Sequence, residues 1–253
     1  MTALDERAAM IYEICVDSIA GVRAAKAAGA GRVELCADLL EGGITPSRGM
    51  IREARRIAGI GLNVMIRPRG GDFLFDDDEF AIMRTDIETA KAEGADGVVI
   101  GLLTAAGEVD MGRTRELIAL ARPLSVTFHR GFDMTPDPFR ALETLIELGV
   151  DRVLTSGQEA SVLEGLPLVA ELITRAGERI IVMPGGGITE RNIDRIAAAS
   201  PREIHFAALE PITSGMRFRR PHVFMGGELR PPEYDRLDTS AALLRSVIAR
   251  ASG

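Results

Sequence analysis

Short apolar runs and helix-like segments alternate along the whole chain, and this alternation most limits the folds open to it. The runs typical of buried strands cover residues 11–16, 32–36, 61–67, 96–101, 124–129, 151–155, 180–184 and 203–206. The helical patterns fall near residues 18–28, 47–58, 78–93, 110–122, 136–148, 158–176, 189–199 and 233–251. Eight strand–helix pairs in 253 residues are typical of an α/β fold, the (β/α)8 TIM barrel, with a doubly wound open sheet as the alternative.

No linker separates these elements, so we expect residues 1–253 to form a single TIM-barrel domain. The longest segment without a clear period, at about residues 207–232, follows the eighth strand. Loops of this length are often lids, binding loops or subunit contacts. A scaffold that binds partners through this loop is one possible function, although it would leave the charged residues within the strands unexplained.

Composition narrows the possible partners. A net charge of -7 and an aromatic content of 4% argue against a nucleic-acid-binding protein. The first residues are charged and no apolar run is long enough to span a bilayer, so we expect no signal peptide and no membrane partner. Two cysteines in a chain of this size fit free thiols in a reducing compartment, which predicts a cytoplasmic protein.

Each of the first two strands carries a glutamate followed two positions later by a cysteine: Glu13 and Cys15, then Glu34 and Cys36. Side chains alternate between the two faces of a strand, so each pair shares a face, which we expect to point into the barrel. Both cysteines would then lie at the carboxyl ends of neighbouring strands, where barrel active sites are found. A buried carboxylate needs a partner, and Arg67 and the histidines are the expected ones.

The segment IRPRGGDF leaves the third strand and offers two guanidinium groups, on Arg67 and Arg69. Arginine suits the recognition of carboxylate or phosphate, and the following glycines allow a ligand to approach the backbone. We therefore predict that both arginines bind an anionic ligand. Alternatively, Arg67 only neutralises an interior glutamate.

The segment VTFHRGFDM leaves the fifth strand with three polar side chains close together. Histidine is well suited to proton transfer near neutral pH, so His129 is a candidate catalytic residue that Asp133 could orient. Arg130 is a candidate ligand for an anion. His205, on the eighth strand, would face the same interior and contact the ligand. The alternative is that His129 is simply a hydrogen-bonded residue at a strand end.

The segment MPGGGIT follows the seventh strand and precedes a helix, so Gly185, Gly186 and Gly187 could form a cradle for an anion. Ser156, in TSGQ after the sixth strand, would lie beside it. A tight turn with a capping residue is the alternative.

The two cysteines have three interpretations: a disulfide, buried core thiols, or a pair of ligands for a soft metal ion.

Seven segments occur in the order and spacing of the CutC family, long called copper homeostasis proteins, and the match runs from about residue 11 to residue 207. They are EICVDS, RVELCADLLEGGITPS, IRPRGGDF, VTFHRGFDM, RVLTSGQ, MPGGGIT and EIH. The resemblance implies a (β/α)8 barrel, a cytoplasmic location and a homo-oligomer, either a dimer or a tetramer. It also implies that Cys15 and Cys36 are the proposed Cu(I) ligands.

Two functions therefore follow from the sequence. In the first, the protein binds Cu(I) through its two cysteines and takes part in copper homeostasis. In the second, it is an enzyme that acts on a small anionic or phosphorylated metabolite, with Glu13, Glu34 or His129 transferring a proton and Asp133 in support. The residues leave open whether the protein is an enzyme.

Overall fold

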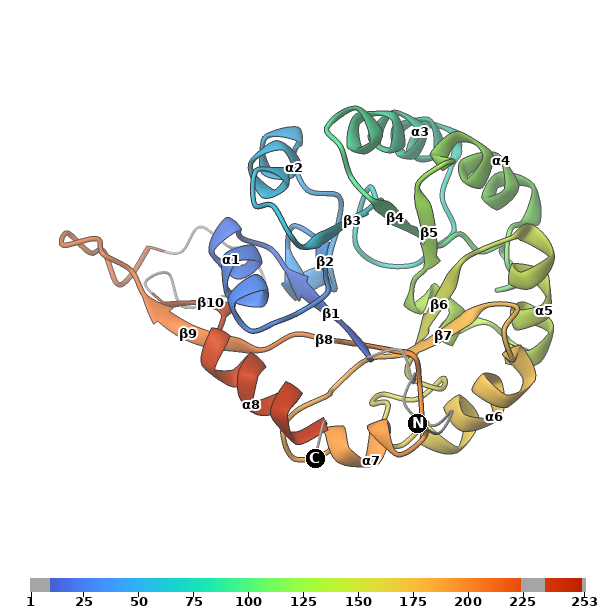
Figure 1. Cartoon of the computed structure of the whole chain (residues 1–253). Helices are drawn as coiled ribbons and strands as arrows, with labels where there is room; N and C mark the ends of the chain where they lie inside the picture. The colour runs from blue at the N-terminus through green and yellow to red at the C-terminus, as the bar shows by residue number, and fades with distance from the viewer. Residues whose placement is uncertain (1–9, 224–234, 252–253) are drawn as a thin grey trace.

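Eight parallel strands form a barrel in the computed structural model, which describes residues 10–223 and 235–251 (Figure 1). Seven strand pairs follow the order β7-β6-β5-β4-β3-β2-β1-β8. A parallel bridge between Gly185 and His205 joins the two ends of this series. The strands are β1 Ile11–Val16, β2 Arg32–Leu35, β3 Gly61–Met65, β4 Gly97–Ile100, β5 Ser125–Phe128, β6 Arg152–Thr155, β7 Ile181–Pro184 and β8 Glu203–Phe206. The predicted TIM barrel is confirmed, and the open-sheet alternative is wrong.

Eight α-helices lie outside the ring of strands (Figure 1). They are α1 Ile19–Ala27, α2 Arg48–Arg55, α3 Asp77–Ala92, α4 Met111–Ala121, α5 Pro138–Leu148, α6 Leu166–Ala176, α7 Ile193–Ala197 and α8 Ala241–Ala251. Two short 3-10 helices, η1 Leu39–Glu41 and η2 Arg130–Met134, lie in loops after β2 and β5. Local sequence signals explain where several helices begin. Helix α3, for example, begins with a capping box in which the side chains of Asp76 and Glu79 accept hydrogen bonds from each other's backbone N–H.

Two predicted helices are much shorter than their sequence patterns. The helix expected at 158–176 begins only at Leu166, because residues 156–165 fold back on themselves. There the Gly157 and Gly165 backbones approach so closely that a Cβ on Gly157 would lie 2.2 Å from the Gly165 carbonyl oxygen. The helix expected at 189–199 contracts to the five residues of α7.

The prediction of a loop at 207–232 was partly wrong, and the last helix begins later than the predicted residue 233. Strand β9, Leu209–Thr213, pairs antiparallel with β10, Asp235–Thr239, and α8 follows at Ala241. This hairpin projects away from the barrel (Figure 1). Residues 224–232 of the predicted loop lie outside the described residues. Among the described helices, none is both long enough and apolar enough to cross a bilayer.

Alternation along the strands sorts apolar residues outward and polar residues inward. On β1, Ile14 and Val16 belong to the main apolar core with Leu35 of β2, where strands pack beneath the helices. The opposite face of β1 carries Glu13 and Cys15, which are in register with Arg32 and Glu34 of β2. The prediction that these side chains point into the barrel is confirmed. Apolar burial therefore stabilises the outer layer, whereas hydrogen bonds must satisfy the inner one.

Candidate functional site

A fully buried carboxylate, Glu13, lies inside the barrel and receives hydrogen bonds from three neighbouring strands. The guanidinium of Arg32 on β2 donates to Oε2 of Glu13. The amide Nδ2 of Asn63 on β3 donates to the same oxygen at 3.0 Å. On the other side, Nδ1 of His205 on β8 lies 2.9 Å from Oε1. Both carboxylate oxygens are thus satisfied by residues whose positions follow from strand register.

A second buried carboxylate lies one layer closer to the amino ends of the strands. Glu203 pairs with the guanidinium of Arg32, and Nε of Arg152 donates to its Oε2 at 3.0 Å. Nη1 of Arg152 also donates to Ser125 and Thr127, at 3.2 Å and 3.3 Å. Two arginines and two glutamates therefore form one charge-balanced network across the barrel floor, which offsets the cost of burying each charge.

This network keeps Glu13 ionised. Burial alone would raise the pKa of Glu13, but the hydrogen bond from His205 and the charge of Arg32 outweigh it, so that the pKa falls from 4.5 to about 2. A carboxyl group with a lowered pKa stabilises the folded state above its ordinary pKa. That contribution is lost as the pH falls from about 4.5 toward 2.

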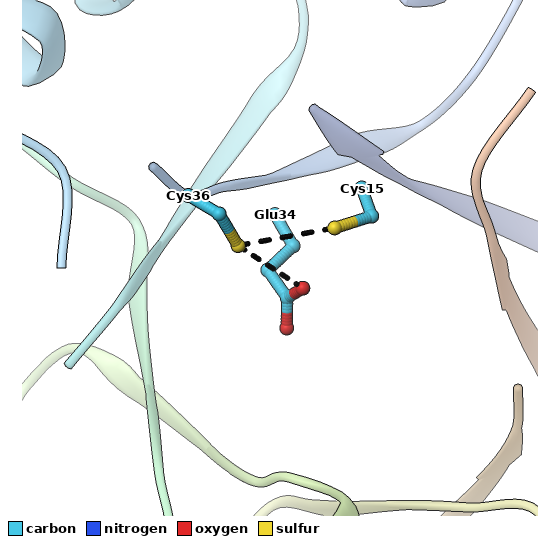
Figure 2. Close-up of side chains that lie close together, drawn as sticks. All are labelled: Cys15, Glu34 and Cys36. Carbon is cyan, nitrogen blue, oxygen red and sulfur yellow. Dashed lines mark hydrogen bonds between the residues drawn. The ribbon is translucent and has the colours of Figure 1, made fainter. Parts of the chain in front are cut away.

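Above this layer, the two cysteine sulfurs converge at the carboxyl ends of β1 and β2 (Figure 2). Sγ of Cys15 lies 3.8 Å from Sγ of Cys36, and both are free thiols. Sγ of Cys36 lies 3.5 Å from Oε2 of Glu34. The same carboxylate oxygen lies 3.7 Å from Nε2 of His205, so His205 connects this cluster to Glu13 below it. The two sulfurs and a Glu34 oxygen all lie within 4.8 Å of one another.

The two thiols are not equivalent. A hydrogen bond from Cys36 and the nearby His205 lower the pKa of Cys15 from 9.0 to about 5, although burial opposes this shift. The pKa of Cys36 is raised well above its ordinary value, because it donates to Cys15 and is buried. Burial likewise raises the pKa of Glu34. Ionisation of the sulfur pair is therefore favoured at Cys15.

A cavity of about 120 Å³ lies at this end of the barrel. Cys15 reaches it with 9% of its surface exposed, whereas Cys36 is fully buried and packs with Met65 and Val99. The cavity is lined by Cys15, Glu34, Gly42, Met65, Arg67, Phe73, His129, Arg130, Leu154 and His205. Apart from Gly42, Met65, Phe73 and Leu154, the lining consists of six polar residues. All six belong to the predicted site, so they surround one space.

The expectation that Arg67 neutralises an interior glutamate is wrong. Its Nη1 donates to the carbonyl oxygens of Glu41 and Gly43, at 2.7 Å and 3.1 Å, and its Nη2 donates to that of Gly71 at 2.7 Å. The guanidinium also lies 5.1 Å from the centre of the Phe73 ring. Arg67 therefore holds the loops after β2 and β3 together at the mouth, and the interior glutamates use Arg32 and His205 instead.

Asp133 does not orient His129, contrary to expectation. Asp133 instead accepts hydrogen bonds from Arg130 Nε at 2.8 Å and from Ser156 Oγ at 2.9 Å. Nδ1 of His129 accepts a hydrogen bond from the Gly131 N–H at 3.0 Å. Burial and the charge of Arg67 lower the pKa of His129 to about 3, so its ring is neutral. Asp133 thus fixes Arg130 and the loop after β6, whereas the backbone fixes His129.

The remaining predicted anion ligands are not part of the cavity lining. Arg69 binds Glu79, and Ser156 bonds Arg130 and Asp133. Within the described part of the chain, residues 185–187 do not line the cavity either, and α7 after them has only five residues. Gly186 nevertheless has a role at the mouth: a Cβ there would lie 3.2 Å from Nη1 of Arg130.

Sequence reasoning missed the residues that neutralise the interior: Arg32, Asn63, Arg152 and Glu203. Strand alternation is the signal that could have found three of them, because Arg32, Asn63 and Glu203 share a face with Glu34, Met65 and His205 of their own strands. Their partners could not be read from the sequence, because long side chains reach across two or more strands. Arg32 and Glu203, for example, approach each other across β1.

Comparisons with known proteins agree with this geometry. The model of the CutC family matches residues 10–209. The copper homeostasis protein cutC homologs of Mus musculus and Homo sapiens are each 50% identical to this chain over 242 residues, which cover 95% of this chain and 89% of the relative.

Solved structures give the same result. The crystal structure of CutC from Streptococcus agalactiae is 34% identical, with a TM-score of 0.75, and the match covers 78% of this chain and 98% of that chain. A thiamine phosphate pyrophosphorylase from Pyrococcus furiosus, at 13% identity and a TM-score of 0.59, covers 96% of both chains and shares the fold alone.

Removing Arg32 should destabilise the protein strongly. Arg32→Met leaves two buried carboxylates, Glu13 and Glu203, without their shared cation, and we expect a loss of about 3–5 kcal/mol in the free energy of unfolding. Arg56→Met, which breaks the exposed pair with Glu53, is the matched control and should cost less than about 1 kcal/mol. Urea unfolding measures both, and equal effects would contradict a structural role for the buried network.

The pKa of Cys15 can be measured from the ultraviolet absorbance of its thiolate in reduced, metal-free protein. Ionisation should have its midpoint near pH 5 and should be absent from Cys15→Ser. In Cys36→Ala the midpoint should move upward in pH, because the removed thiol is the hydrogen-bond donor that lowers the pKa most. A single step near the ordinary value of 9.0 in the unaltered protein would contradict the assignment.

Proposed function

Because the chain belongs to the CutC family, we propose that it binds copper as Cu(I) through Cys15 and Cys36 and acts in copper homeostasis. The observation that carries the proposal is the 3.8 Å separation of the two sulfurs at the mouth of the barrel (Figure 2). A location in the cytoplasm, where both thiols stay reduced, and assembly into a dimer or tetramer belong to the same proposal.

The donor set supports a soft monovalent ion. Thiolates select Cu(I) or Zn(II) over hard cations, and structural zinc takes four protein ligands. Among the described residues, the sulfur cluster offers two sulfurs and one carboxylate, from Glu34. A site with few ligands and one ready thiolate therefore fits copper better than structural zinc.

The sulfur separation also supports a bent arrangement. If each metal–sulfur bond is about 2.3 Å, as for zinc thiolates, a linear unit would need sulfurs about 4.6 Å apart. At 3.8 Å the same bonds would enclose an angle of about 110°. Glu34 could supply a further ligand beside the two sulfurs, and His205 would hold its carboxylate in place.

An enzymatic role is the second candidate, and one observation favours it. Cys15, Glu34 and His205 line a single cavity at the active end of the barrel, and their pKa values are shifted by one another and by burial. Such shifts are common where proton transfer is required. The Cys15 thiolate would act as a base or nucleophile, and the protonated Glu34 as an acid.

An anaerobic competition titration with Cu(I) tests the copper proposal. The reduced protein should bind one Cu(I) tightly, and the Cys15→Ser/Cys36→Ser double variant should lose that binding. Met216→Leu, which removes an exposed sulfur outside the cluster, is the control and should bind as the unaltered protein does. Equal stoichiometry and affinity in the double variant would overturn the proposal.

A further inference from the structure

The barrel mouth contains buried polar atoms that the sulfur site does not use. Six buried side-chain polar atoms in the described part of the chain lack a hydrogen-bond partner. Three of them, Nε of Arg67, Nε2 of His129 and Oε1 of Glu34, belong to residues that line the same cavity. Only 6% of the surface of Arg67 is exposed, 4% of that of His129 and 2% of that of Glu34. Unpaired buried polar atoms are costly, so their concentration around one cavity indicates a missing partner.

Two of these atoms are hydrogen-bond donors held in fixed positions. The terminal nitrogens of Arg67 donate three hydrogen bonds to loop carbonyl oxygens, whereas its buried Nε–H has no partner. Nδ1 of His129 accepts the Gly131 N–H, so a neutral ring carries its proton on Nε2. Both side chains contact the Phe73 ring, at 5.1 Å for the guanidinium and 4.9 Å between ring centres, and both line the same cavity.

Arg130 adds positive charge to the same wall of the cavity. Its Nε and Nη2 are bound to Asp133 and Ser156, which fixes the guanidinium beside Gly186. Across the cavity lie Glu34 and the sulfur of Cys15. The cavity thus has donors and cations on the wall formed after β3 and β5, and acidic groups on the wall formed by β1 and β2.

We propose that this cavity binds a small monocarboxylate, with one carboxylate oxygen accepting hydrogen bonds from Nε–H of Arg67 and Nε2–H of His129. Two donors from one side match a carboxylate oxygen. A phosphate dianion would need more free donors than these two. A cavity of about 120 Å³ limits the ligand to a few heavy atoms, the size of acetate or lactate. This deepens the enzymatic candidate but does not depend on copper binding.

The experiment uses the full-length, metal-free protein labelled with ¹⁵N-histidine. The chain has three histidines, and His129→Phe identifies the His129 signals. We expect lactate and acetate each to cause a saturable shift of the Nε2–H resonance of His129, and inorganic phosphate to cause none. The proposal is overturned if neither carboxylate causes a saturable shift, or if phosphate binds in preference to both.

Affinity measurements provide the second test. His129→Phe keeps a ring of similar size but removes the donor, so lactate affinity should fall about tenfold to a hundredfold, as expected for a hydrogen bond to a charged group. His222→Phe alters an exposed histidine outside the cavity and should bind lactate normally. Unchanged affinity in His129→Phe would overturn the proposal. His129→Phe leaves both sulfurs and Glu34 in place and should still bind Cu(I), which separates this site from the copper site.

Discussion

The structure depends on one constraint, an ionised carboxylate buried at the centre of a barrel. Glu13 can remain charged there only while Arg32, Asn63 and His205 reach it from three other strands. A register slip of one residue in any of these strands would turn the partner to the outer face and leave the charge unpaired. The network therefore specifies how β8, β1, β2 and β3 align, and the same alignment brings the sulfurs of Cys15 and Cys36 together two residues further along.

Function at the mouth follows from this order of layers. The floor of the barrel balances its own charges, so the residues above it are free to face a ligand. His205 connects the two levels, because one ring nitrogen bonds Glu13 and the other lies near Glu34. Soft sulfur donors come from the ends of β1 and β2, whereas the fixed N–H donors come from the segments after β3 and β5. The proposed metal ion and the proposed organic anion would therefore use different side chains of one cavity.

The sequence predicted the barrel from the alternation of strands and helices. It predicted the inward direction of Glu13 and Glu34, and both cysteines at neighbouring strand ends, from the alternation of side chains. The distance between the two sulfurs could not be predicted, because it depends on side-chain conformation. The sequence also did not predict the partners of Arg67 or Asp133, since those depend on how loops after different strands fold over the mouth. Strand β10 was missed because residues 235–239, DRLDT, contain a single apolar residue and so lack the apolar pattern of a strand. Local periodicity determines which face a residue occupies, whereas loop conformation determines which neighbour it meets.

The central claim is that both sulfurs bind one copper ion, and X-ray absorption spectroscopy of the Cu(I)-loaded protein tests it most directly. The account predicts two sulfur scatterers in the first coordination shell of each copper, with one of them lost in Cys15→Ser and one in Cys36→Ser. A shell that contains only nitrogen or oxygen, or a single sulfur in the unaltered protein, would contradict it.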